Sequence, residues 1–172
     1  NRIIFPIENH LGRTVAFTGR LLPNKNELEN PEITAPKYLN SPESPIFNKS
    51  KILYGLSRTK NSIAESRNVF LVEGQMDFLA CWQAGIKNAA AVSGTGLTTH
   101  HLERLRRIAD SVIVSFDNDE AGLRALERSL DIFNSFDFHV KVLNLGEHKD
   151  PAEAVLKEPD FLNKAINLAK PA

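Results

Sequence analysis

The feature that most constrains the fold of this chain is an alternation of short apolar segments with longer amphipathic ones, which begins at Val69. The longer segments have helical spacing; Leu123, Leu126 and Leu130, for example, fall on one face. Strands separated by helices are typical of a parallel sheet that is covered on both faces. We therefore predict an α/β fold with a mainly parallel sheet of about four strands flanked by helices. The predicted strands are Val69–Glu73, Ala89–Val92, Ser111–Phe116 and Val140–Leu145.

The predicted helices lie between and after these strands. Gly85 is the expected C-terminal stop of the first helix, and Thr98 or Thr99 supplies a cap oxygen for the second. The expected helices are Gln75–Ala84, His100–Ala109, Glu120–Phe133, Asp150–Leu156 and Asp160–Leu168, preceded by a short ordered stretch at Ile52–Leu56 and a helix at Arg58–Ser66.

The first third of the chain has a different pattern. Two apolar strands, Arg2–Ile7 and Arg13–Phe17, flank a turn and predict a β-hairpin. Residues 23–45 are rich in Pro, Asn, Glu and Ser and are expected to be irregular. We therefore expect residues 1–66 to form part of a smaller mixed α+β subdomain, and residues 67–172 to form the α/β domain with its trailing helices.

Charge is unevenly distributed, although the 21 Lys and Arg residues balance the 21 Asp and Glu residues. Residues 1–70 hold 10 basic and 6 acidic residues, whereas residues 71–172 hold 11 and 15. A basic part beside an acidic, metal-seeking part suits a polyanionic substrate, and chance is the alternative explanation. The single cysteine, Cys81, excludes an internal disulfide and a multi-cysteine zinc site and fits a reducing cytoplasm. The sequence has no apolar run long enough to span a membrane.

Acidic residues follow two of the predicted strands directly. Glu73 ends one strand, Asp117 and Asp119 follow another, and Asp77 lies one helical turn beyond Glu73. The carboxyl ends of parallel strands meet at one edge of a sheet, where ligands bind. Carboxylates gathered there repel one another, and a divalent cation such as Mg²⁺ neutralises them. The alternative is that each acid caps a helix or interacts with a helix dipole.

A glycine loop, Gly94-Thr95-Gly96, follows the second predicted strand at the same edge. Its backbone N–H groups can approach a phosphate at a helix N-terminus, or the loop is simply a tight turn. The lysine of a Walker P-loop is absent.

These motifs resemble the Toprim domain shared by bacterial primases, topoisomerases and some nucleases: Glu73-Gly74 is similar to its glutamate motif, and Asp117-Asn118-Asp119 to its Asp-x-Asp motif. Further segments resemble the bacterial replicative primase family in order and spacing. These are Arg2–Ile7, Gly12-Arg13, Phe17–Arg20, Lys37-Tyr38-Leu39-Asn40-Ser41-Pro42, Leu53–Leu56, Val72–Asp77, Gly94-Thr95, Phe116–Gly122 and Lys149-Asp150-Pro151.

The resemblance implies template-directed synthesis of short RNA primers by metal-dependent nucleotidyl transfer, with Mg²⁺ or Mn²⁺ as cofactor and two ions during catalysis. It implies no zinc in this segment. It assigns Glu73, Asp117 and Asp119 as the principal metal-binding acids and Asp77 and Asp150 as further acids. It assigns Arg20, Lys37, Tyr38, Asn40, Lys49, Gly94 and Thr95 to nucleotide or template binding.

The implied partners are single-stranded DNA, ribonucleoside triphosphates and the RNA primer, in the bacterial cytoplasm at the replication fork. A replicative helicase is expected only through a C-terminal domain beyond Ala172. We expect an excised core piece whose isolated activity is low or nil. Two positions depart from the family pattern: Asn118 replaces a glycine, and Ala152, followed by Glu153, replaces an outer acid.

Two other functions remain open at this point. One is a Toprim-type nuclease, against which the segment Lys37–Pro42 argues. The other is a non-catalytic nucleic-acid binding module whose acids only cap helices. The cluster Arg104-Arg106-Arg107 is interpreted as a solvated helix face, with a nucleic-acid patch as the alternative, and Tyr38 either stacks on a base or pins its loop.

Overall fold

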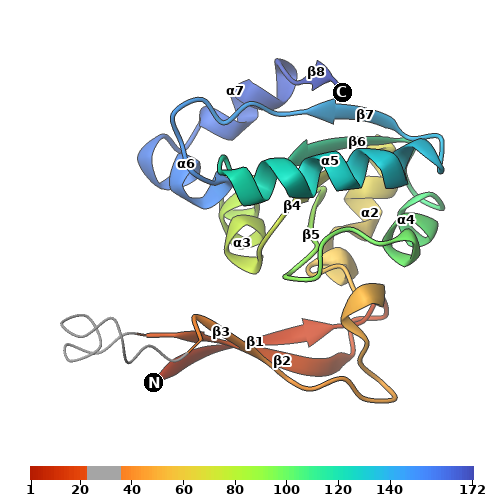
Figure 1. Cartoon of the computed structure of the whole chain (residues 1–172), viewed down its shortest axis with the longest axis vertical. Coiled ribbons are helices and arrows are strands. Elements are labelled where there is room, and N and C mark those ends of the chain that lie inside the picture. Colours follow the sequence, from red (N-terminus) through yellow and green to blue (C-terminus); the bar gives the residue numbers. More distant parts are fainter. Residues whose placement is uncertain (23–35) are drawn as a thin grey trace.

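The protein contains two separate β-sheets, shown in Figure 1 by a computed structural model that describes residues 1–22 and 36–172. One is a three-stranded sheet of order β1-β2-β3, and the other is a five-stranded sheet of order β5-β4-β6-β7-β8. The strands are β1 (Arg2–Glu8), β2 (Thr14–Leu21), β3 (Tyr38–Asn40), β4 (Asn68–Val72), β5 (Ala89–Ala91), β6 (Ser111–Ser115), β7 (His139–Val142) and β8 (Lys170–Pro171). The helices are the 3₁₀-helix η2 (Lys49–Lys51) and the α-helices α2 (Leu56–Ser66), α3 (Gln75–Gln83), α4 (Thr99–Leu105), α5 (Glu120–Asn134), α6 (Pro151–Lys157) and α7 (Phe161–Asn167).

The five-stranded sheet confirms the predicted α/β fold. Strands β5, β4, β6 and β7 are parallel, and only β8 at the edge is antiparallel. The inner strand β4, between β5 and β6, has no exposed surface from Val69 to Val72, because both faces are covered. Helices α2, α4 and α5 pack on one face, and α3, α6 and α7 pack on the other. In Figure 1, α5 crosses in front of the sheet.

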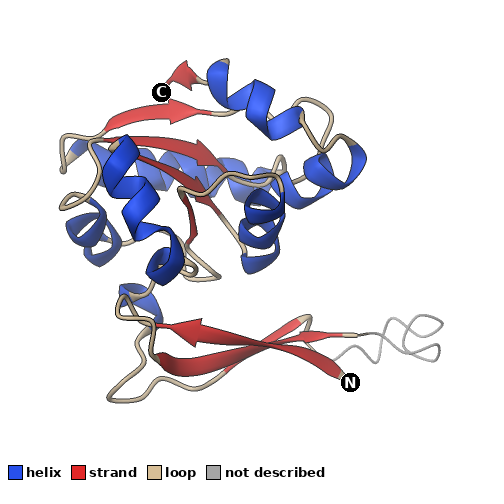
Figure 2. Ribbon diagram, turned by 180° about the vertical axis from the view of Figure 1, so that it is seen from behind, coloured by secondary structure: helices blue, strands red, loops and turns tan. Residues whose placement is uncertain are grey.

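The three-stranded sheet lies apart from this body, as Figure 2 shows. It is antiparallel throughout, and its buried core is small, consisting of Ile7, Ala16 and Phe47. A backbone bridge between Tyr54 and Ala91 joins the segment after it to β5. The small sheet is therefore held to the body through few contacts rather than through a shared apolar core.

The sequence missed two short strands. Tyr38–Asn40 lies in the stretch that we expected to be irregular, but it pairs with Thr18–Arg20 of β2. Lys170–Pro171 forms the edge strand β8 of the five-stranded sheet, where it pairs with β7. Segments of three and two residues carry no readable alternation, so only their neighbours define them. Residues 23–35 of the expected irregular stretch lie outside the described part of the chain.

Other boundaries differ by a few residues. Helix α4 ends at Leu105 rather than Ala109, because residues 106–108 turn back toward the sheet. Strand β7 begins at His139 and ends at Val142, earlier than predicted. No helix in residues 1–22 and 36–172 is long and apolar enough to cross a membrane.

Candidate active site at the acidic sheet edge

The acids that follow β4 and β6 lie side by side, as the sequence predicted. The two strands are parallel neighbours, with Val72 opposite Ser115. The backbone N–H of Asp117 lies 3.4 Å from Glu73 Oε2, toward which it donates a long hydrogen bond. Adjacent strands therefore bring these two residues to the same point of the sheet edge.

Asp77 lies behind them, at the start of α3, with only 7% of its surface exposed. Its Oδ2 accepts a hydrogen bond from Gly74 N–H at 3.0 Å, and its Oδ1 accepts one from Ala152 N–H at 3.3 Å. Burial, followed by the charge of Asp150, raises the pKa of Asp77 to about 6, against the opposing effect of these hydrogen bonds. Asp77 thus joins the N-termini of α3 and α6 beneath the site.

The pKa of Asp117 is raised further than that of Asp77. Burial is the main cause, and the charges of four further acids add to it, raising its pKa to about 7. These acids are Glu73, Asp77, Asp150 and Asp119. Asp117 forms no ion pair with any cation in the described part of the chain. The edge therefore holds an excess of negative charge at Asp117 that the described residues do not balance.

Asp119 also acts as a helix cap, which was the alternative explanation for it, and Asp150 caps a helix as well. Asp119 Oδ1 accepts from Gly122 N–H at 2.8 Å at the start of α5. Asp150 Oδ1 accepts from Glu153 N–H at 2.7 Å at the start of α6. Capping does not remove them from the site, since both raise the pKa of Asp117 through their charge.

Gly122 determines how closely α5 approaches this edge. A Cβ atom at this position would collide with the backbone carbonyl of Asp117. The turn between β6 and α5 therefore requires glycine, and its tight closure fixes the position of Asp117.

The small sheet faces the acidic edge across a cavity of about 820 Å³. Tyr38 lies between Arg20 and Lys37, each 5.9 Å from the centre of its ring, an arrangement that favours pinning of the segment over base stacking. Burial is the main cause that raises the pKa of Tyr38, and the charges of Asp77 and Asp150 add to it. The cavity joins most of the predicted site: Arg20, Lys37, Tyr38, Asn40, Glu73, Asp77, Gly94, Asp117 and Asp150.

Three predicted residues do not line this cavity. Lys49 lies beside Asn40 and Ser93 around a small adjoining space. Thr95 donates its hydroxyl to the carbonyl of Val92 at 3.3 Å within the glycine loop. Asp119 affects the site only by capping α5 and by raising the pKa of Asp117 through its charge.

No role was predicted for Gln75, yet this side chain links the two sheets beneath the site. It is 5% exposed; its Nε2 donates to Thr18 Oγ1 at 3.3 Å, and its Oε1 accepts from Ser93 Oγ at 2.9 Å. A polar residue at the start of a helix, two residues after a strand-end acid, was the only available signal. Its partners, the buried Thr18 and the half-buried Ser93, come from the other sheet and from the loop after β5, which the sequence could not bring together.

The structure shows which contacts are made at the two positions that depart from the family pattern, Asn118 and Ala152 with its neighbour Glu153. Asn118 Nδ2 donates to the carbonyl of Gly146 at 3.0 Å, so it ties two loops together. Glu153 does not take the place of the acid missing at Ala152, because its oxygens accept from Lys149 N–H at 2.7 Å and pair with Lys157 at 2.9 Å.

The donor set at this edge fits a hard divalent cation that keeps part of its water. In the described residues, no group of three His, Cys, Asp or Glu side chains is arranged to hold a metal ion by itself. Mg²⁺ is commonly bound through one or two carboxylates, together with water and substrate phosphates. The oxygen donors of Glu73 and Asp117, together with the unbalanced charge at Asp117, match that mode of binding better than a closed protein cage.

Two protein families match this chain and together cover most of it. Residues 70–155 match the Toprim-like family, and residues 1–60 match the N-terminal domain of the DNA primase catalytic core. The five-stranded sheet with acids at its edge is therefore a Toprim-like domain.

Curated relatives and solved structures agree with this assignment. The chain is 39% identical to a DNA primase of Halalkalibacterium halodurans and 45% identical to one of Campylobacter jejuni, over 99% and 98% of its length. It spans only 28% and 27% of those relatives. The Aquifex aeolicus primase structure, with its zinc-binding and RNA polymerase domains, superposes with a TM-score of 0.87 at 32% identity, over 99% of this chain and 41% of that one.

A DnaG primase catalytic domain bound to single-stranded DNA superposes with a TM-score of 0.84 at 35% identity, covering 99% of this chain and 52% of that one. The chain belongs to the Toprim-containing family of DnaG-type bacterial DNA primases.

Proposed function

We propose that this chain is the part of a bacterial DNA primase that carries the catalytic centre for primer synthesis. The observation that carries the proposal is the single cavity in which the cations Arg20 and Lys37 face the acids Glu73 and Asp117. Primer synthesis joins a ribonucleoside triphosphate to a 3′-hydroxyl on a single-stranded DNA template. Both reactants bear phosphates, which suit a cationic wall, and the reacting phosphate suits a divalent cation.

The roles of the protein's own residues follow from their positions. Arg20 and Lys37 bind and orient phosphates of the template or of the incoming nucleotide. Glu73 and Asp117 hold Mg²⁺ or Mn²⁺, with Asp77, Asp119 and Asp150 supplying further negative charge. The cation, when bound, neutralises charge on the triphosphate and positions it for in-line displacement. Two ions during catalysis, helicase recruitment outside this chain and action at the cytoplasmic replication fork belong to the same proposal.

We also propose that the chain divides into two domains at residues 66 and 67. Residues 1–66 contribute the cationic wall and residues 67–172 the acidic edge, with α2 as the connecting helix that packs on the second sheet.

The test is primer synthesis by the full-length protein on a single-stranded template with Mg²⁺ or Mn²⁺. Asp117→Asn is expected to lower the rate by about 100-fold or more, since it removes charge at the cation site while preserving shape. Asp131→Asn makes the same change on an exposed position of α5 and serves as the matched control. A wild-type rate in Asp117→Asn would refute the site, and cleavage of the template without synthesis would point to a nuclease.

A further inference from the structure

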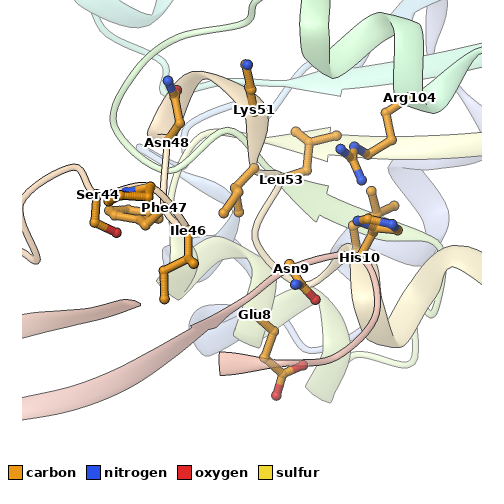
Figure 3. Close-up of a pocket in the computed structure, with 13 residues that line it drawn as sticks. Glu8, Asn9, His10, Ser44, Ile46, Phe47, Asn48, Lys51, Leu53 and Arg104 are labelled. Atoms are coloured by element: carbon orange, nitrogen blue, oxygen red, sulfur yellow. The ribbon is translucent and has the colours of Figure 1, made fainter. Parts of the chain in front are cut away.

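A second cavity lies at the opposite end of the interface between the two sheets (Figure 3). It holds about 310 Å³ and lies between the β1–β2 turn, the segment before η2, and α4. A neighbouring cavity of about 460 Å³ shares four of its residues, so the two form one depression, here called the turn cavity. The shared residues are His10, Lys51, Leu56 and Arg104.

Four cations line the turn cavity: Lys51 of η2, Lys60 of α2, Arg104 of α4, and Arg107 in the turn that follows α4. None of them forms an ion pair with another residue of the described chain. Lys60 only donates to the backbone carbonyl of His10, at 3.1 Å. By contrast, Arg106 of the same arginine cluster pairs with Asp110 at 2.6 Å and does not line the cavity. Of the three arginines in this cluster, Arg104 and Arg107 therefore line the cavity without an acidic partner among the described residues, whereas Arg106 does not.

The two acids of the turn cavity offset only part of the charge of these four cations. Glu8 accepts from Ser57 Oγ at 2.6 Å and pairs with Arg58 at 3.1 Å, and Figure 3 shows its carboxylate pointing away from Arg104. Glu103 lies 3.4 Å from His100, which is charged only when protonated, so Glu103 offsets at most one of the four cations. His10 faces Arg104 in Figure 3; its pKa is lowered by burial first, then by the charges of Arg104 and Lys60. The potential in the turn cavity is therefore positive.

The other wall of the turn cavity is apolar. Phe47, Leu53 and Leu56 are buried there, with exposed fractions of 2 to 3%, whereas Ile46 at the rim is 70% exposed. A cationic wall opposite an apolar one matches a ligand with a phosphate end and a flat apolar end.

The turn cavity is separate from the acidic edge. The space that adjoins both, beside Asn40, Lys49 and Phe47, holds only about 10 Å³. A single water molecule needs roughly 10–15 Å³ of such space, so no nucleic-acid strand threads from one cavity to the other through it.

We propose that the turn cavity is a second binding site, for a nucleoside polyphosphate whose phosphates lie on Lys51, Lys60, Arg104 and Arg107 and whose base packs on the apolar wall. The phosphates of a metal-free nucleoside triphosphate are polyanionic, and the excess of cations in the turn cavity supplies charge-assisted hydrogen-bond donors for them. The site goes beyond primer synthesis, because it lies apart from the acids and requires no divalent cation.

The test measures binding of GTP and of inorganic tripolyphosphate to the full-length protein by calorimetry in EDTA. EDTA removes the divalent cation on which the proposed catalytic site depends, and the part of the binding that a turn-cavity variant removes, and Lys37→Ala does not, is assigned to the turn cavity. Arg104→Gln removes a half-buried cation shared by both parts of the cavity. Arg128→Gln makes the same charge change on the exposed face of α5 and is the matched control.

We expect both probes to bind, GTP more tightly because of the apolar wall. Arg104→Gln should weaken binding about tenfold or more, as expected for a lost charge-assisted contact, and Arg128→Gln less than about twofold. The proposal is overturned if neither probe binds, or if the two variants weaken binding equally. It is also overturned if a single-stranded oligonucleotide loses affinity in Arg104→Gln while GTP binding does not.

Discussion

The two sheets of this protein differ in how they are held, and the candidate active site takes one wall from each. The five-stranded sheet is buried on both faces, and its inner strand β4 has no exposed surface between Val69 and Val72. The three-stranded sheet has a buried core of only Ile7, Ala16 and Phe47 and leaves Ile4 and Phe17 more than half exposed. The acids therefore stand on the rigid body, and the cations Arg20 and Lys37 on the weakly anchored sheet.

This difference indicates that changes to the body act on stability and on acid geometry. Changes to the small sheet act on how polyanions are held. The following four changes test that division, from the largest expected effect to the smallest.

His101 of α4 tests burial in the body. It is fully buried, and burial lowers its pKa from 6.5 to about 4. Between these values the unfolded chain binds a proton that the folded chain excludes, so folding stability present above pH 6.5 is lost as the pH falls toward 4. The shift corresponds to about 3 kcal/mol. Urea unfolding across this pH range measures it.

Asp77 and Asp117 have raised pKa values and contribute the opposite slope, so the effect is measured as a difference. His101→Asn keeps an acceptor for the Thr98 N–H and should remove the loss attributed to His101. His10→Asn, on the exposed turn of the small sheet, should change the slope far less. Equal effects of the two variants would contradict the division.

Gly122 and Gly19 compare the two sheets at the level of the backbone. A Cβ at Gly122 meets the Asp117 carbonyl, whereas a Cβ at Gly19 of β2 meets side-chain atoms of Arg2 and Ile4 at 3.1 and 3.2 Å. Gly122→Ala should therefore destabilise the protein by about 1–3 kcal/mol and lower primer synthesis. Gly19→Ala should cost well under that, because the two flexible side chains can move. Thermal unfolding and rate measurements on both variants decide this, and a larger effect at Gly19 would reverse the comparison.

Gln75 tests the connection between the sheets. Gln75→Ala leaves Thr18 without its side-chain partner in a buried place and should cost about 1–2 kcal/mol. Its effect on primer synthesis should fall on KM for the template rather than on metal affinity, because the acids keep their positions. Asn61→Ala, which removes an exposed side-chain amide on α2, is the control and should be near neutral. A change in Mn²⁺ affinity for Gln75→Ala alone would show that the connection supports the acids instead.

Lys37 tests the cationic wall and has the smallest expected effect on the fold. Lys37→Ala should weaken single-stranded DNA binding more at low salt than at high salt, since a phosphate contact is screened by ions. The slope of log affinity against log salt should fall by about one. An unchanged affinity at all salt concentrations would remove Lys37 from the phosphate-binding surface.

The same division explains what could be predicted from the sequence. Strands β4 and β6 were readable because continuous apolar runs end in acids, and parallel topology then places Glu73 beside Asp117. The helix cap at Asp119 was weighed as an alternative, whereas the cap at Asp150 was not predicted. These features depend on local sequence and one general rule of sheet topology.

Features that depend on contacts distant in sequence were not readable. Strand β3 exists because β2 offers it a partner, and Gln75 gains its role from Thr18, 57 residues earlier. The arginine cluster of α4 was interpreted as one solvated face. The structure instead pairs Arg106 with Asp110 and turns Arg104 and Arg107 toward Lys51, which lies far from them in sequence.

The most direct measurement is a Mn²⁺ titration followed by paramagnetic broadening of backbone amide signals. The central claim is that the acids at the ends of β4 and β6 form one cation site. It predicts selective broadening of Glu73, Asp77, Gly94, Asp117 and Asp119, with the signals of Lys51 and Arg104 unaffected, and loss of this pattern in Asp117→Asn. Diffuse broadening, or the same pattern in Asp117→Asn, would contradict the claim and leave these acids as helix caps.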